Sequence, residues 1–287
     1  MDGVGLYPGG NTIPTAHLTR GLTAASKIVP RDSAGSPSAS GVIGLSSIGV
    51  SNTTYEFSKG AWNDPYLGTP FKARAEADPK MAPSIVIVDG AQEGRPVTKI
   101  VNGVETSWPN PDSDAWKIML ARLAAAGVTR HQVQALWIKL PEGGPGGSTV
   151  TKYISRHLPP LIKTLKNARD LFPNLQQAYF SSRIYGGYGT GLSPEPYAYW
   201  HGLAIKEIVQ RQINGLLFSR PWLAWGPYLW ADGLIPRSDG LTWECGDMVD
   251  SDGIHPGGEA VDKVATMLLD SFKTHLASCA WFLLEGC

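Results

Sequence analysis

Apolar runs of strand length alternate with segments of helical periodicity along most of this 287-residue chain. The runs at 41–48, 84–88 and 133–140 are predominantly apolar rather than apolar at every second residue, and shorter ones follow at 178–181 and 222–225. Strands buried on both faces have this character, and they belong to parallel sheets covered by helices. The pattern therefore predicts an α/β fold in which a central parallel sheet of about five strands lies between two helical layers.

The segments between these runs carry apolar residues at helical spacing. The predicted helices are 114–126, which ends before Gly127, then 161–172, 195–213 and a last one that begins near Gly258. Residues 1–40 are rich in Gly, Pro, Ser and Thr, which predicts an irregular N-terminal leader packed on the fold. Neither an internal repeat nor a convincing linker is found, so we expect a single domain over residues 1–287.

Composition narrows the class of protein. A hydrophobic fraction of 43% with 17% charged residues is typical of a globular chain. The formal net charge is zero and no basic stripe is present, which argues against a nucleic-acid partner. No apolar run approaches the length of a membrane span. The oligomeric state stays open.

Two features bear on the compartment. The start of the chain, Met1–Gly5, shows no signal-peptide pattern, but an initiator methionine in front of a mature sequence would look the same. We expect a secreted or periplasmic protein whose signal peptide is absent from this chain, and a cytoplasmic location stays open. Of three cysteines, Cys279 and Cys287 could close a short terminal loop, while Cys245 has no internal partner left; three reduced thiols are the alternative.

Polar residues that follow strand ends indicate where a site would form. Ser51, Gly94 and Lys139 each follow one of the first three runs, and the ligand crevice of a parallel sheet lies beyond the carboxyl ends of its strands. Near the C-terminus, Asp252 precedes His255 by three residues. A carboxylate at that distance can hold an imidazole in one tautomer and stabilise it once protonated. These residues predict a hydrolytic triad with Ser51 as nucleophile, His255 as base and Asp252 as the orienting acid.

Two other carboxylates could take the role of the orienting acid. Asp247 and Asp250 lie close to Asp252 and compete for the same role. The three carboxylates could instead bind a hard cation such as calcium, although their spacing fits no EF-hand loop. No Cys/His spacing matches a zinc site. We therefore expect neither a metal nor a cofactor.

The motifs resemble those of the SGNH/GDSL hydrolase superfamily, which includes esterases, lipases and carbohydrate deacetylases. Gly49-Val50-Ser51 matches its nucleophile turn, with Val50 where the family has Asp, and Asp252 and His255 match its final motif. Gly44-Leu45-Ser46 is a rival alignment that would leave almost no first strand. The resemblance extends over residues 41–275 and implies a flavodoxin-like three-layer α/β/α sandwich.

The resemblance also implies an oxyanion hole. The backbone N–H groups of Ser51 and Gly94 would form it, with Gly90 as the second match for the glycine. Lys139 stands where the family has an asparagine donor. Its ammonium could stabilise an oxyanion as a point charge, or it could form a structural ion pair with Glu93 or Glu142.

The segment after the fourth strand runs along the same crevice. Its Arg183 and Tyr185 are candidates for substrate contact, as is Gly90. A structural ion pair between Arg183 and Glu195 is the alternative interpretation of the arginine.

The sequence thus favours a serine esterase that hydrolyses carboxylic esters or O-acetyl groups of a small molecule or saccharide. The alternative is a non-catalytic carbohydrate- or ligand-binding protein on the same fold, which the departures at Val50 and Lys139 favour. A dinucleotide-dependent enzyme is excluded because no Gly-x-Gly-x-x-Gly motif follows a strand with an acid at the expected distance.

Overall fold

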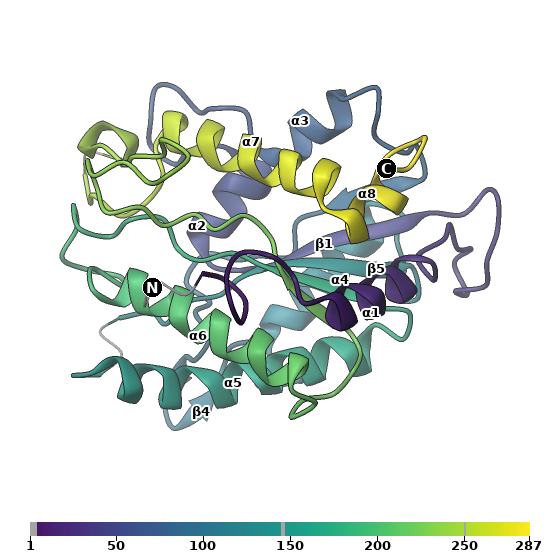
Figure 1. Cartoon of the computed structure of the whole chain (residues 1–287), viewed down its shortest axis with the longest axis horizontal. Helices are drawn as coiled ribbons and strands as arrows, with labels where there is room; N and C mark the ends of the chain where they lie inside the picture. Colours follow the sequence, from purple (N-terminus) through teal and green to yellow (C-terminus); the bar gives the residue numbers. More distant parts are fainter. Residues whose placement is uncertain (1–4, 145–146, 250) are drawn as a thin grey trace.

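The computed structural model describes residues 5–144, 147–249 and 251–287, and its centre is a parallel five-stranded sheet (Figure 1). The strands follow the order β2-β1-β5-β6-β7, and every neighbouring pair runs parallel. They are β1 (Ile43–Gly49), β2 (Ile85–Val88), β5 (Val133–Lys139), β6 (Gln177–Phe180) and β7 (Trp222–Trp225). The predicted α/β class and parallel sheet are confirmed. An exposed two-stranded hairpin, β3 (Ile100–Val101) with β4 (Val104–Glu105), lies outside this sheet.

Helices cover both faces of the sheet, as predicted. One layer consists of α1 (Thr15–Ala25), η1 (Tyr55–Lys59), α3 (Phe71–Ala77), α7 (Gly258–Thr274) and α8 (Leu276–Phe282). The other consists of α4 (Asp114–Ala125), α5 (Val150–Leu171) and α6 (Tyr197–Ile213). Figure 1 shows α3 and α7 above the sheet and α5 and α6 below it. Each face of the sheet buries its own hydrophobic cluster.

Alternation along β5 decides which layer each of its side chains meets. Leu136 and Ile138 belong to the cluster under α4, α5 and α6, whereas Trp137 belongs to the opposite cluster. The Trp137 ring stacks on Phe57 of η1, with ring centroids 5.6 Å apart. Because side chains two residues apart on a strand share a face, Lys139 lies on the η1 side of the sheet.

The N-terminal leader differs from the expected irregular segment, because it contains helix α1. Its buried residues are His17, Gly21 and Ala25, at helical spacing but with little apolar character. A Cβ at Gly21 would lie 2.5 Å from the ring of Trp222, so the helix packs closely against β7 through small residues. Periodicity of large apolar residues could not reveal such a contact.

Helix α5 begins at Val150 rather than at the predicted Leu161 and continues through Pro159 and Pro160. Proline removes a backbone donor and usually ends or kinks a helix, which is why the sequence predicted a later start. At the N-cap, the Thr149 side chain accepts a hydrogen bond from the N–H of Lys152. One face of the helix is buried along its length, and this burial outweighs the local preference.

Residues near the C-terminus are joined covalently. Cys279 of α8 and Cys287 form a disulfide, and Cys245 is an exposed free thiol. Of the helices in the described ranges, none is both long and apolar enough to cross a membrane.

Candidate active site

The turn after β1 presents Ser51 as the first residue of α2 (Ser51–Thr54), which continues into η1. A side chain at Gly49 would collide with the side chain of Thr53 and the carbonyl oxygen of Lys139, so the turn requires glycine. The Thr53 hydroxyl donates to that carbonyl at 2.7 Å and ties the turn to the end of β5. Ser51 is thereby fixed at the carboxyl edge of the sheet.

Ser51, His255 and Asp252 form a continuous hydrogen-bonded chain. Ser51 Oγ lies 2.7 Å from His255 Nε2, and His255 Nδ1 lies 2.5 Å from Asp252 Oδ2. The second carboxylate oxygen accepts from the N–H groups of Ile254 and His255 at 2.8 and 2.9 Å. Burial opposes ionisation of Asp252, but the bonds from His255 and Ile254 hold its pKa below the usual value. The arrangement presents a serine hydroxyl to an imidazole that is oriented by a charged carboxylate.

The helix that begins at Ser51 also contacts the loop that carries His255. The Asn52 side chain donates to the carbonyl oxygen of Ile254 at 3.0 Å. The rings of Tyr55 and Trp62 stand edge-on to His255, with centroids 5.6 and 5.8 Å away. The imidazole is therefore held both through the backbone of its loop and by contacts with two aromatic rings. None of these partners was singled out from the sequence, because they carry no motif of their own.

A cavity of about 240 Å³ opens beside Ser51. Gly94 forms part of its wall with a φ of +66°, a conformation that favours glycine. Buried Arg183 also lines it. The complete wall is Val50, Ser51, Asn52, Gly94, Pro96, Lys99, Pro141, Glu142, Gly143, Arg183 and Leu192. The structure thus brings together Ser51, Gly94 and Arg183 from three separate strand ends.

The structure places two other sequence-predicted site residues away from this cavity. The N–H of Gly90 donates to Ser47 Oγ at 3.1 Å, so this group is already engaged. Tyr185 packs against Tyr188, with ring centroids 5.2 Å apart. Neither is among the described residues that line the cavity.

Lys139 does not reach the cavity either, because its ammonium forms a fully buried ion pair with Glu56 of η1. The two acids that the sequence offered as ion-pair partners of Lys139 lie near other cations instead. Glu93 pairs with Lys59 at 2.8 Å, and Glu142 lies 3.8 Å from Arg156. Burial lowers the pKa of Lys139 and raises that of Glu56, while their mutual attraction opposes both shifts. Strand alternation explains the outcome, since Lys139 shares its face with Trp137 and that face is covered by η1.

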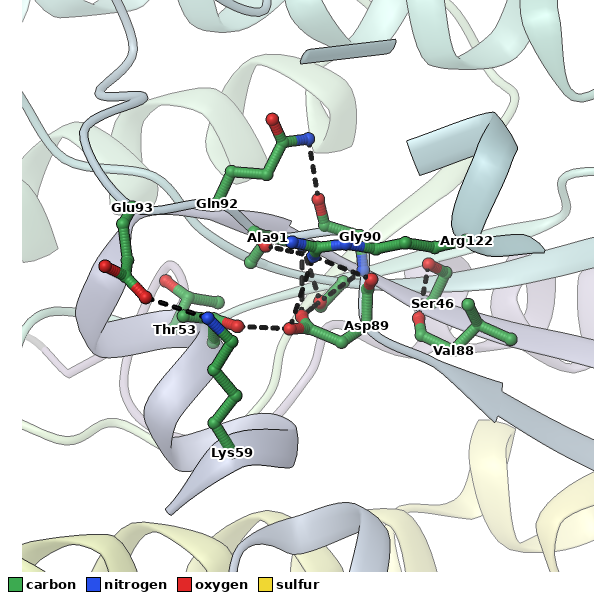
Figure 2. A network of polar contacts seen from close by, with 12 residues as sticks. Ser46, Thr53, Lys59, Val88, Asp89, Gly90, Ala91, Gln92, Glu93 and Arg122 are labelled. Carbon is green, nitrogen blue, oxygen red and sulfur yellow. Dashed lines mark hydrogen bonds and ion pairs between the residues drawn. The ribbon is translucent and has the colours of Figure 1, made fainter. Parts of the chain in front are cut away.

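Asp89, which directly follows β2, connects the elements around Ser51. Figure 2 shows its carboxylate in a polar network near Ala91 and Arg122. It accepts from the hydroxyls of Ser47 and Thr54 and, at 3.1 Å, from the N–H of Ala91. Because these donors belong to β1, α2 and the loop that leads to Gly94, Asp89 holds the turn at Ser51 and the cavity wall together. The sequence signal that could have identified Asp89 is a single acidic residue directly after a predicted strand.

Of the two acids that compete with Asp252 for the role of orienting acid, the structure describes one. Buried Asp247 pairs with Lys263 at 2.7 Å, and Asp250 lies outside the described residues. Within the described ranges there is no group of three or more His, Cys, Asp or Glu side chains that could hold a metal ion.

Lys139→Met should destabilise the protein strongly, because it leaves Glu56 buried without its partner. Breaking a buried pair in this way costs about 3–5 kcal/mol of the free energy of unfolding, measured by denaturant titration at neutral pH. The double variant Glu56→Gln with Lys139→Met should recover much of the loss. Any hydrolytic rate measured for the wild type should change little in folded Lys139→Met, and a large loss of that rate without destabilisation would contradict the structural role.

No family model matches the chain, and no curated protein matches its sequence. Solved structures are similar to it. One is a carbohydrate esterase whose active site has divergent catalytic and non-catalytic binding functions, with 12% identity and a TM-score of 0.41 over 79% of this chain and 64% of that one. A protein from Slackia heliotrinireducens described as an SGNH hydrolase has 13% identity and a TM-score of 0.38 over 80% of this chain and 98% of its own. The extracellular lipase of Streptomyces rimosus has 12% identity and a TM-score of 0.41 over 80% and 99%. The likeness is one of fold.

Proposed function

We propose that this protein is a serine esterase that hydrolyses carboxylic esters or O-acetyl groups. The observation that carries the proposal is the chain of contacts from Ser51 Oγ through His255 to Asp252, at 2.7 and 2.5 Å. Nucleophile, base and orienting acid come from opposite ends of the chain, and each lies within hydrogen-bond reach of the next.

In the proposed reaction, Ser51 Oγ attacks the acyl carbon while His255 Nε2 takes the hydroxyl proton. Asp252 keeps the other ring nitrogen protonated and stabilises the imidazolium. His255 then returns the proton to the leaving alkoxide, and water releases the acyl group by the same steps. The N–H groups of Ser51 and Gly94 are proposed to stabilise the oxyanion, because both residues line the cavity.

The cavity beside Ser51 and the surface near His255 suit different parts of an ester. The cavity beside Ser51 has apolar walls from Val50, Pro96 and Leu192, and its volume of about 240 Å³ suits a short acyl group. Trp62 is not among the residues that line the cavity, is 47% exposed and stands next to His255, which returns the proton to the leaving alcohol. An exposed indole can pack against a sugar ring, which favours a saccharide ester as substrate.

Trp62→Ala should reduce kcat/KM for an acetylated monosaccharide by about tenfold, the value of one aromatic contact. Ethyl acetate, whose alcohol is too small to cover the indole, should be hydrolysed at nearly the wild-type rate. Leu67→Ala is the matched control, since Leu67 is an exposed apolar residue of the same segment at 54% exposure. Equal losses on both esters would contradict a role in binding the alcohol.

Covalent labelling by a fluorophosphonate tests the proposed function. An activated Ser51 should be modified and identified by peptide mass, and a panel of nitrophenyl esters and acetylated sugars should be hydrolysed. A non-catalytic binding protein would give neither result. The proposal includes a location outside the cytoplasm, supported by the Cys279–Cys287 disulfide, because such bonds persist mainly in oxidising compartments.

A further inference from the structure

The cavity beside Ser51 contains a buried cation with unused hydrogen-bond donors. Arg183 follows β6, lines the cavity and is 2% exposed. Its Nε and Nη2 atoms are buried and have no hydrogen-bond partner in the described part of the chain. A guanidinium cannot discharge itself by losing a proton at ordinary pH. An unpaired buried charge is costly, so this position calls for a compensating anion.

The carboxylates near Arg183 form ion pairs or hydrogen bonds with other groups, although Glu142 Oε1 has no hydrogen-bond partner in the described part of the chain. Glu56 is paired with Lys139. Glu195, the partner considered from sequence, accepts from the backbone of Gly186 and the indole of Trp230, at 3.0 and 2.9 Å. Glu142 lies in the cavity wall, where the Thr98 hydroxyl donates to it at 3.2 Å. Arg183 forms no ion pair with any described carboxylate, so its charge is left for something that enters the cavity or forms there.

The side-chain nitrogens of the other residues in the cavity wall each have a hydrogen-bond partner. Asn52 donates its amide to the carbonyl oxygen of Ile254, and Lys99, which is exposed, donates to the carbonyl oxygen of Gly94. Lys139 lies outside the cavity, in its pair with Glu56. Among the described side chains of the wall, Arg183 is therefore the one with nitrogen atoms that have no hydrogen-bond partner.

We propose that Arg183 is a catalytic residue that donates a hydrogen bond to the oxyanion formed at Ser51, an inference that rests on the proposed esterase function. As the Ser51 Oγ–carbon bond forms, the carbonyl electron pair moves to oxygen and the hydroxyl proton moves to His255. Arg183 keeps all its protons and supplies a fixed positive charge where negative charge develops. When the leaving alkoxide departs, the electron pair returns to the carbonyl and the guanidinium again has no anion hydrogen-bonded to its Nε and Nη2.

Arg183→Met should lower kcat by roughly 10²–10³-fold, the usual cost of an oxyanion donor, with KM nearly unchanged. The loss should be the same for nitrophenyl acetate and for the nitrophenyl ester of succinic acid, whose acyl group carries a carboxylate. Arg183→Lys should recover part of the rate, because an ammonium keeps the charge without the planar fork. If Arg183→Met does not fold, the two esters are compared on Arg183→Lys, where an equal partial loss is expected.

Arg156→Met is the matched control, since this cation lies 3.8 Å from Glu142 but is 59% exposed. It should leave kcat nearly unchanged. A loss confined to the succinyl ester would overturn the inference and indicate that Arg183 binds the carboxylate of a charged acyl group. A lower melting temperature with intact kcat would overturn it in favour of a structural role. If the wild type hydrolyses no ester and Ser51 is not labelled, the esterase proposal itself fails, whereas an active wild type with an active Arg183→Met variant removes only the inference.

Discussion

On the proposed function, Ser51→Ala is expected to fold normally and to lose esterase activity by roughly four to six orders of magnitude, as removal of the nucleophile does in serine hydrolases. The hydroxyl lies 2.7 Å from His255 Nε2 and lines the cavity, and its loss removes only one oxygen atom from the fold. Steady-state hydrolysis of nitrophenyl acetate, together with a circular dichroism melt, measures both expectations. Fluorophosphonate labelling should disappear in the same variant.

Ser46 and Ser47 provide matched controls, because both are fully buried serines of β1 with engaged hydroxyls. Ser46 Oγ donates to the carbonyl oxygen of Val88 and Ser47 Oγ donates to Asp89, each at 2.6 Å. Alanine at either position should lower stability by about 1 kcal/mol or more while the chemistry survives. If Ser51→Ala stays active and Ser46→Ala or Ser47→Ala is dead, the nucleophile has been misassigned.

Asp252→Asn is expected to lower kcat by up to about four orders of magnitude with KM similar, because an amide no longer holds the imidazole in the required tautomer. One carboxylate oxygen of Asp252 is hydrogen-bonded to His255 Nδ1, and the other accepts hydrogen bonds from two backbone N–H groups. The loop should therefore keep its shape while the proton transfer fails. Comparison of kcat and KM on one ester measures the effect.

Asp247→Asn is the control for this second variant. Asp247 is buried and pairs with Lys263, so its substitution should lower the melting temperature and leave kcat nearly intact. A four-order loss of kcat in Asp247→Asn, with an active Asp252→Asn, would show that the acid was assigned wrongly.

The sheet was predictable because its strands are buried on both faces and therefore read as apolar runs. Residues 222–225 matched β7 at both ends, and 133–140 differed from β5 by one residue. Helix α1 and the first part of α5 were missed for a different reason. Their packing depends on small residues and on burial around two prolines, which local periodicity underestimates.

The contact between Asp252 and His255 was predictable because both residues lie in one short loop. The position of Ser51 followed from a rule about strand ends, since parallel strands bring their carboxyl edges together. The assignment of Lys139 depended on a resemblance, and the alternation Trp137–Lys139 was the available hint that its side chain turns toward the η1 layer.

By itself, the sequence determined the layered α/β architecture and the edge of the sheet at which its polar residues gather, because strand burial and strand ends are local properties. Only the tertiary structure decided how the buried charges are partnered. Glu56 pairs with Lys139, 83 residues away along the chain, and no described carboxylate pairs with Arg183 in the wall of the cavity beside Ser51. The partner of a buried charge depends on which elements meet in space, and no periodicity along the chain encodes that meeting.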